Sequence, residues 1–452
     1  MRRLFAPILS LSLLACTACT VQSPAPDAPQ PADTRPPPPP AWLQALDAQY
    51  DAQLRVAGLD DRMFTPEHWW DVATPLLAKE RGFETREIGR SVEDRPLRHI
   101  RWGKGSKKVL LWSQMHGDES TASMALVDLF RFLGEHPGHP LVQRIGQGTT
   151  LHVLPILNPD GAARFERRNA LGIDINRDAR DLVSPEARAL HDLREQLKPD
   201  FGFNLHDQQV GYRAGDSDRG TAIALLAPAF NEAREVDASR GRAIEVAVAI
   251  RAALEPYIAG HIAKWDDEFN PRAFGDLTSK AGVSTILIES GGIEGDLQKQ
   301  QLRKLNFLAL VAALDAIASG NHAGLSHAPY DTLPENGDVW ADLRIVGGLL
   351  VLPDAPPAQV DVSVSFRNAL QERDGVIRDV GDLSDAGARR TIDASGLYII
   401  PFAPPGATAS TQERALAPEQ PAYFHLSRDP QGRNIVWTLA GSVDPKQRAP
   451  KP

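Results

Sequence analysis

Over residues 41–325, continuous apolar runs alternate with segments in which apolar residues recur at helical spacing. Continuous apolar runs predict buried strands, and apolar residues at helical spacing predict helices between them. The predicted strands are 109–115, 149–157, 200–206 and 283–289, and the predicted helices are 120–133, 185–197, 229–254 and 297–318. Strands that alternate with helices are typical of an α/β domain whose sheet is buried on both faces. We therefore predict an α/β fold with a mixed, mostly parallel twisted sheet flanked by helices.

The pattern changes at both ends of this region. Residues 83–103 predict a hairpin that turns near Glu93 and Asp94. After Gly324 short β-rich runs are separated by Pro, Gly and Asp, which predicts a separate small all-β domain over 329–445. The catalytic part would then span 41–325.

The first forty residues have the organisation of an export signal and a tether. Residues 1–15 combine two arginines with an apolar run that is too short to span a bilayer. Leu-Leu-Ala before Cys16 resembles a bacterial lipobox, which implies lipidation of Cys16. The alternative is a plain signal peptide that is cut near Ala18. Residues 16–40 are rich in proline and predict an extended tether. We expect an exported lipoprotein, anchored to a membrane and facing the periplasm or the cell surface.

Composition narrows the chemistry. The chain has 452 residues, 42% of them hydrophobic and 24% charged, which is ordinary for two or three globular domains. Its only cysteines are Cys16 and Cys19, so a metal site in the folded part must use histidines and carboxylates. The net charge of −9 becomes −11 when residues 1–15, with Arg2 and Arg3, are removed. Such an acidic balance argues against nucleic acid as a partner.

The pair His116 and Glu119 is the first candidate for chemistry. Both follow the predicted strand 109–115 and precede the predicted helix 120–133. Ligands of open α/β sheets bind at this place, at the carboxyl end of a strand. An imidazole and a carboxylate on one turn can reach the same zinc ion. The spacing also occurs by chance, so the hypothesis depends on a third ligand elsewhere.

Two further residues end apolar strands. His206 closes the run Gly-Phe-Asn-Leu, and Glu289 closes Ile-Leu-Ile. Two histidines and a glutamate with an open fourth position form a recognised catalytic zinc set. A carboxylate at the position of Glu289 is suited to act as a general base on water. The alternatives are a structural histidine and a structural salt bridge.

Arginines are concentrated between these residues. Asn158-Pro159-Asp160-Gly161 is a turn signal, and Arg164, Arg167, Arg168 and Arg177 follow it. A guanidinium group can hold a carboxylate through two hydrogen bonds or stabilise an oxyanion. For Arg164 and Arg168 a solvated basic surface is the favoured interpretation.

Together these motifs resemble the zinc carboxypeptidase (M14) family. The motifs are His116-x-x-Glu119, the Asn-Pro-Asp-Gly turn, Arg167-x-Asn169, Gly172-Ile-Asp-Ile-Asn-Arg177, His206 and Glu289, in the family order. The resemblance implies one Zn²⁺ per chain, held by His116, Glu119 and His206. It also implies that Asn176 and Arg177 bind a terminal carboxylate, that Arg167 polarises the scissile carbonyl and that Glu289 is the base and proton shuttle.

The sequence departs from the family pattern in the segment before Glu289. Residues 263–282 contain no tyrosine where family members often place one over the substrate. Asp178 follows Arg177 where asparagine is more usual, which would add negative charge beside the anchor. Arg272, in the same segment, would favour an acidic substrate side chain.

We therefore predict a zinc-dependent metallocarboxypeptidase that hydrolyses a peptide or isopeptide bond beside a free C-terminal carboxylate. Peptidoglycan-derived peptides are among the candidate substrates. A zinc-dependent deacylase of N-acyl amino acids is the first alternative. A non-catalytic lipoprotein that binds the cell wall or a partner is the second.

Overall fold

The computed structural model describes residues 33–337, 340–406 and 416–443. The predicted signal peptide 1–15 and Cys16 lie outside the described residues. Of the predicted tether, the structure describes residues 33–40, which form neither helix nor strand. The limits proposed for the catalytic and β-rich parts remain predictions.

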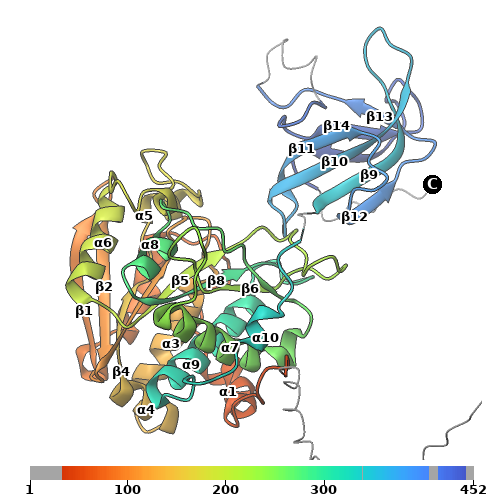
Figure 1. The fold of residues 1–452 in the computed structure, drawn as a ribbon. Helices are drawn as coiled ribbons and strands as arrows, with labels where there is room; N and C mark the ends of the chain where they lie inside the picture. Colours follow the sequence, from red (N-terminus) through yellow and green to blue (C-terminus); the bar gives the residue numbers. More distant parts are fainter. Residues whose placement is uncertain (1–32, 338–339, 407–415, 444–452) are drawn as a thin grey trace, which may run out of the picture. The chain divides into compact units, whose positions relative to one another are not determined.

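An eight-stranded sheet organises the larger part of the chain (Figure 1). Its order is β1-β2-β4-β3-β5-β8-β6-β7. The strands are β1 (Phe83–Arg90), β2 (Pro96–Gly103), β3 (Lys107–Ser113), β4 (Thr149–Leu154), β5 (Phe201–Asp207), β6 (Ile223–Leu226), β7 (Ile262–Lys264) and β8 (Ser284–Ser290). The four central strands β4, β3, β5 and β8 are parallel, whereas β1, β2 and β4 pair antiparallel. The predicted mixed, mostly parallel sheet is confirmed, including the hairpin β1–β2.

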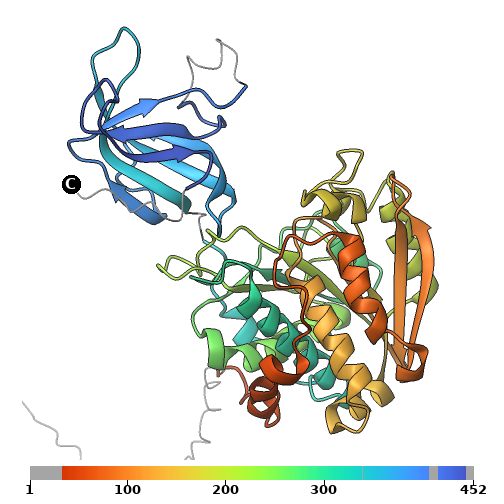
Figure 2. The ribbon, with the colours of Figure 1, turned by 180° about the vertical axis from the view of Figure 1, so that it is seen from behind.

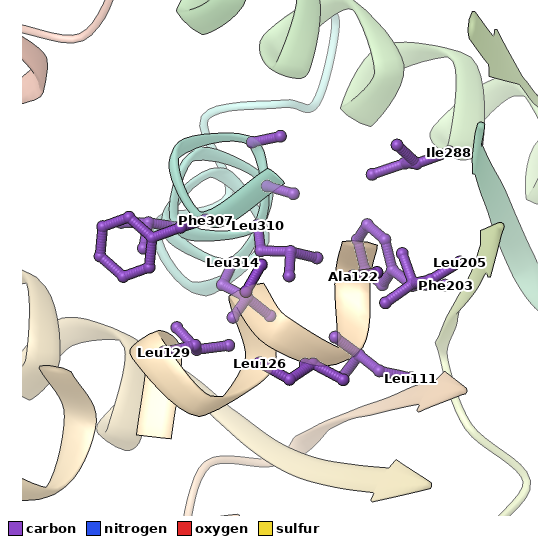
Figure 3. Packing of buried hydrophobic residues seen from close by; sticks show 14 of the residues in the cluster. Leu111, Ala122, Leu126, Leu129, Phe203, Leu205, Ile288, Phe307, Leu310 and Leu314 are labelled. Carbon is purple, nitrogen blue, oxygen red and sulfur yellow. The ribbon is translucent and has the colours of Figure 1, made fainter. Parts of the chain in front are cut away.

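Two hydrophobic cores lie on opposite faces of this sheet, because successive side chains of a strand point to opposite sides. On β3, Val109 and Leu111 belong to the larger core, while Leu110 and Trp112 belong to the smaller one. Helices α3 (Thr121–Glu135), α4 (Pro140–Gly148), α7 (Ala238–Ile258) and α9 (Gln300–Ser319) supply the larger core. Figure 3 shows Leu126 of α3 and Leu310 of α9 packed beside strands β3, β5 and β8.

The opposite face carries shorter helices, so both faces of the sheet are covered (Figures 1 and 2). The smaller core takes residues from α6 (Pro185–Leu197) and α8 (Phe274–Lys280). The remaining helices are α1 (Leu43–Gln49), α2 (Pro66–Ala73), α5 (Pro159–Arg164) and α10 (Ala328–Asp331). Helix α6 has the predicted bounds. Helix α7 begins later than predicted because Asp237 caps its first turn, accepting a hydrogen bond from the Arg240 amide at 2.8 Å.

A buried ion pair fastens the N-terminal segment to the helices. Asp128 of α3 accepts hydrogen bonds from Arg303 of α9 at 2.6 and 2.7 Å and from the Tyr50 hydroxyl at 2.6 Å. Arg303 also donates to the carbonyls of Val56 and Leu59. Both charges are fully buried, and every one of these contacts compensates part of the cost of burying them. The segment before β1 is therefore an integral part of the fold.

The C-terminal part forms a second sheet with its own core. The strands are β9 (Ala341–Leu350), β10 (Ala358–Asn368), β11 (Arg373–Gly381), β12 (Ala388–Asp393), β13 (Tyr398–Pro401), β14 (Tyr423–Ser427) and β15 (Ile435–Ala440). Their order is β11-β10-β9-β13-β14-β15, with β12 paired to β9. Val362, Val364 and Trp437 are among the buried residues. The predicted all-β character is confirmed. Within the described ranges, the helices are too short or too polar to cross a membrane.

Candidate metal centre and active site

Three neighbouring strands bring the predicted ligands and base to one edge of the sheet. The turn between β3 and α3 carries His116 and Glu119, β5 carries His206, and β8 carries Glu289. Strands β3, β5 and β8 are adjacent and parallel, so their carboxyl ends meet at this edge. His206 and Glu289 are direct partners in the register of β5 and β8. All four side chains are buried and line one cleft.

The atoms that could hold a metal converge. Glu119 lies between the two imidazoles, with Oε1 2.7 Å from His116 Nδ1 and Oε2 2.7 Å from His206 Nδ1. One ligand atom from each of the three residues lies within 4.8 Å of the others. Two imidazole nitrogens and a carboxylate are a donor set that suits zinc. The three residues therefore fit the ion that the sequence implied.

Asp174 contacts His116 at the ring nitrogen that faces away from Glu119. Its Oδ1 lies 3.0 Å from His116 Nε2 and accepts the Asn176 amide at 2.9 Å. A carboxylate at the second nitrogen of a ligand imidazole fixes the orientation of the ring. Burial lowers the pKa of His116, but Glu119 and Asp174 outweigh burial and raise it to about 9. An imidazole must be neutral to bind a metal, so metal binding at His116 would release any proton held there.

Glu289 is a buried carboxylate in the cleft, and one of its oxygens has no hydrogen-bond partner among the described residues. Its Oε2 is buried and makes no hydrogen bond to the described residues. Burial, followed by the negative charges of Glu119 and Asp207, raises the pKa of Glu289 well above its usual range. Arg167 and Lys299 oppose this rise. A carboxylate held in this way can accept a proton from a molecule in the cleft.

The Asn-Pro-Asp-Gly turn explains why the ligand turn is so tight. A side chain at Gly117 would come within 2.0 Å of the Gly161 backbone, so only glycine permits this contact. Asn158 caps α5 by accepting the Gly161 amide at 2.9 Å, and its Nδ2 donates to the Arg167 carbonyl at 3.2 Å. The motif therefore places the backbone of Arg167 against the turn that carries the ligands.

The Arg167 guanidinium lies directly beside the ligand group. Its Nη1 lies 3.1 Å from both Glu119 Oε1 and His116 Nδ1, and its Nη2 donates to Asp174 Oδ2 at 3.0 Å. The side chain is 44% exposed, so part of the guanidinium faces the cleft. It is positioned to donate to an oxygen that also approaches the metal position.

Asn176 and Arg177 lie in a 3-10 turn, Ile175–Arg177, and line the same cleft. Asn176 Oδ1 accepts the Phe274 amide at 3.0 Å. Arg177 Nη1 donates to the Asn176 carbonyl at 2.8 Å, which folds the guanidinium over the turn. The Asn176 side-chain amide and the Arg177 guanidinium can thus both donate to a carboxylate in the cleft.

Asp178 does not add charge to this anchor as we expected. Its carboxylate accepts the amides of Val183 and Ser184 at 2.8 and 2.7 Å and the Ser184 hydroxyl at 2.8 Å. Ser184 is the residue that caps α6. Asp178 therefore holds the loop before α6, and its charge is compensated there.

The aromatic residues of the segment before Glu289 lie partly in the cleft and partly in the smaller core. Trp265 and Phe269 line the cleft, whereas Phe274 is fully buried in the smaller core. Arg272 is exposed and donates to the Arg177 carbonyl at 3.0 Å. The acidic side chains Asp266, Glu268 and Asp276 also line the cleft. Burial raises the pKa of Asp276 to about 6, although Arg177 and Arg240 lower it. Sequence reasoning missed this acidic lining, although the run Asp-Asp-Glu at 266–268 indicates an acidic segment.

Tyr212 lies in the cleft although the segment 263–282 contains no tyrosine. It comes from the loop after β5, and its ring packs edge-on against Trp265 with centroids 5.3 Å apart. Burial and the nearby Glu289 raise the pKa of its hydroxyl. A tyrosine from another loop thus reaches the side of the cleft where the sequence pattern left one missing.

Seven of the eight predicted site residues line this one cleft, and the eighth, Cys16, lies outside the described residues. Sequence reasoning missed Asp174, Asp207, Tyr212 and Lys299, which also surround the site. Asp174 lies in the motif Gly172–Arg177 and Asp207 directly follows His206, so the sequence already placed both beside predicted site residues. Lys299 has no signal in the sequence.

Residues 78–209 match the model of the zinc carboxypeptidase family. Mouse carboxypeptidase D is 32% identical over 171 residues, which are 27% of this chain and 12% of that protein. Mouse carboxypeptidase Z is 32% identical over 122 residues, which are 22% of this chain and 19% of that protein. The matched part thus spans less than a fifth of either relative.

Two solved structures are similar to part of this chain. A metallo-carboxypeptidase from Burkholderia cenocepacia covers 57% of this chain, with 70% of its own chain matched, at 20% identity and a TM-score of 0.45. Bovine thrombin-activatable fibrinolysis inhibitor, in complex with a tick carboxypeptidase inhibitor, covers 58% of this chain, with 98% of its own chain matched, at 16% identity and a TM-score of 0.47.

Proposed function

We propose that this protein is a zinc-dependent metallocarboxypeptidase that hydrolyses a peptide or isopeptide bond beside a free C-terminal carboxylate. One observation carries the proposal: His116, Glu119 and His206 converge within 4.8 Å beside the unpartnered carboxylate of Glu289. The family match over residues 78–209 supports the same reaction class. When bound, zinc would polarise the scissile carbonyl and lower the pKa of water toward about 7.

Glu289 would move the proton. Its buried Oε2 would accept a proton from the attacking water and then return it to the departing amine. The raised pKa of Glu289 suits the first transfer, because a carboxylate with a raised pKa is a stronger base. No other described carboxylate in the cleft combines this burial with a place opposite His206 in the register.

Arg167 would stabilise the charge that develops on the carbonyl oxygen. Its guanidinium lies beside the ligand group and is partly open to the cleft. A donor aimed at a developing oxyanion typically contributes about 3 kcal/mol to catalysis. Asp174 holds this guanidinium through its Nη2 and prevents it from turning into solvent.

Asn176 and Arg177 would bind the free carboxylate of the substrate. Both line the cleft beside Arg167, and Arg177 offers donors in a planar fork that matches a carboxylate. This anchor would make the enzyme an exopeptidase, because a bond in the middle of a chain has no terminal carboxylate to bind.

We propose that the substrate's terminal residue carries an amino group on its side chain. The carboxylates of Glu268 and Asp276 line the cleft and would attract an ammonium group. Arg272 would favour an acidic side chain, but its Nε donates a hydrogen bond to the Arg177 carbonyl. Lysine-type residues would fit, as would wall peptides whose terminal residue bears an amine. Comparing C-terminal lysine, leucine and glutamate in one peptide series tests this preference, and a preference for glutamate would contradict it.

We further propose export and lipid anchoring at Cys16, which would place the enzyme on a membrane facing the periplasm or the cell surface. This rests on the sequence of residues 1–40 alone. Metabolic labelling with a radioactive fatty acid should mark the wild-type protein and not Cys16→Ser. A labelled Cys16→Ser protein would contradict the anchor.

The experiment that tests the function uses the purified chain with and without zinc. We expect about one zinc per chain and release of a single C-terminal residue, abolished by a chelator. Glu289→Gln should keep the zinc and lose nearly all turnover, while the matched exposed substitution Glu294→Gln should have no effect. An active, zinc-loaded Glu289→Gln protein would remove Glu289 from the role of base. Hydrolysis of N-acyl amino acids in preference to peptides would favour a deacylase, and no zinc at all would favour a binding protein.

A further inference from the structure

Lys299 is a buried lysine that the proposed mechanism does not use. Its side chain is 1% exposed, although it stands at the start of α9 next to the cleft. The Nζ donates to Asp207 Oδ2 at 2.9 Å and to the Ser290 carbonyl at 3.1 Å. A buried ammonium group is costly unless it is paired and hydrogen-bonded, and these two contacts supply the pairing.

The backbone of Lys299 is held in an uncommon conformation. Its φ of 52° lies in the left-handed region, which non-glycine residues rarely adopt and which costs of order 1 kcal/mol or more. Asp296 makes this possible, because it accepts the first amides of α9 from Gln300, Gln301 and Leu302. The helix is thus capped by Asp296, and the side chain of Lys299 is directed inward.

The two hydrogen-bond partners of Lys299 are the neighbours of a predicted metal ligand and of the predicted base. Asp207 follows His206 on β5, and Ser290 follows Glu289 on β8. Asp207 and Ser290 are themselves register partners at the ends of these strands. Lys299 therefore connects the last positions of the strand that carries a predicted ligand and the strand that carries the predicted base.

Asp207 extends the contact to the ligand group. Its amide donates to Glu119 Oε2 at 3.1 Å, and its carboxylate accepts the Thr121 hydroxyl at 2.7 Å. Arg62 approaches the same carboxylate at 3.6 Å. All three contacts are made to Asp207 Oδ2, and Lys299 makes the closer of the two charged ones.

We propose that Lys299 is a positioning residue that fixes the spacing between His206 and Glu289, and hence the alignment of the base with the metal position. The inference rests on the proposed function. It assigns Lys299 no proton transfer and no contact with substrate. Its effect would pass through the backbone of Asp207 and Ser290, so it should alter metal affinity as well as turnover.

The test compares Lys299→Met with Lys304→Met in the full-length, zinc-loaded protein. Lys304 lies on the same helix but pairs with Asp47 and Asp51 at the surface. For Lys299→Met we expect kcat to fall 10- to 100-fold with KM changed less than twofold, and zinc to bind about 10-fold more weakly in a chelator competition. Lys299→Arg, which keeps the charge, should recover part of both losses. Lys304→Met should match the wild type.

The double variant Lys299→Met with Asp207→Asn guards against a protein that fails to fold. It leaves no unpaired buried carboxylate at this position, and we expect it to fold and to show the same loss of kcat. Wild-type kcat and zinc affinity in a folded variant would overturn the proposal. Failure of both variants to fold would assign Lys299 to stability and overturn it equally. A wild-type protein without peptidase activity would contradict the proposed function, while the zinc affinities would still test Lys299.

Discussion

The amide of Phe274 donates a hydrogen bond to Asn176 Oδ1 at 3.0 Å, across 98 residues of sequence. This bond fixes which end of the Asn176 side chain is the donor, since Oδ1 is occupied and Nδ2 is left to donate. It also ties the turn that carries Arg177 to the start of α8. The proposed carboxylate anchor is therefore built with its donors already oriented.

Replacing Arg177 by alanine should weaken transition-state binding of substrates with a free carboxylate by roughly 2 to 5 kcal/mol, measured as kcat/KM. The same peptides with an amidated C-terminus should show no further loss. Arg180→Ala is the control, because Arg180 is exposed and pairs with Asp181. Equal losses on free and amidated peptides would show that Arg177 does not bind the carboxylate.

The pH dependence of kcat/KM should report Glu289. Burial, Glu119 and Asp207 raise its pKa, so the ionised base is lost as the pH falls through a value above the usual range of a glutamate. A plot of kcat/KM against pH should therefore rise on its acidic side, with a midpoint above about 4.3, the ordinary pKa of a glutamate. Because Lys299 lowers this pKa, Lys299→Met should move the midpoint upward. A midpoint at or below the ordinary value would contradict the environment described for Glu289.

Tyr212→Phe tests whether the tyrosine from the β5 loop contacts the substrate. Its hydroxyl lies in the cleft near Glu289, and one lost hydrogen bond should lower kcat/KM roughly 2- to 10-fold without changing zinc content. Tyr257→Phe is the control and should leave kcat/KM unchanged, because this tyrosine of α7 is partly exposed and interacts with Asp47. An unchanged kcat/KM in Tyr212→Phe would leave its ring against Trp265 as its sole contribution.

A pair of buried histidines outside the site should make the fold sensitive to acid. His99 Nε2 lies 3.0 Å from His152 Nδ1, and Arg86 donates to His99 Nδ1. Burial and cationic neighbours lower the pKa of His99 to about 3 and of His152 to about 4. Between these values and about 6.5 the unfolded chain binds more protons than the folded chain, so stability falls as the pH falls.

Urea unfolding at pH 7 and pH 5 measures this effect. The contribution of His99 is fully present above about pH 6.5 and should decrease by about 2 kcal/mol at pH 5. A variant with leucine at both His99 and His152 should show a smaller difference between the two pH values. An unchanged difference would mean that other groups carry the acid sensitivity.

The ligand edge was predictable from the sequence because it depends on local signals. His206 and Glu289 end apolar strands, and parallel strands bring their carboxyl ends to one edge of the sheet. The strands β3, β5 and β8 were all recognisable as apolar runs, so this part of the site followed from pattern. The hairpin β1–β2 and helix α6 were predictable for the same reason.

The rest of the site depends on contacts that no local pattern encodes. Tyr212 enters the cleft from an irregular loop, and Lys299 turns inward only because Asp296 caps α9 in its place. Asp178 stands beside the anchor in sequence, yet its carboxylate binds the amides before α6. In each case the direction of a side chain is set by partners distant in space or by the path of a loop.

The ion pair between Asp128 and Arg303 limits how far the N-terminal end of this protein can be shortened. The family match begins at residue 78, but the carbonyls of Val56 and Leu59 and the hydroxyl of Tyr50 complete the shell of these two charges. A chain trimmed to the matched boundary would open this shell to water at the junction of α3 and α9. A shortened protein that keeps this shell must therefore begin before Tyr50, well before the first residue of the family match.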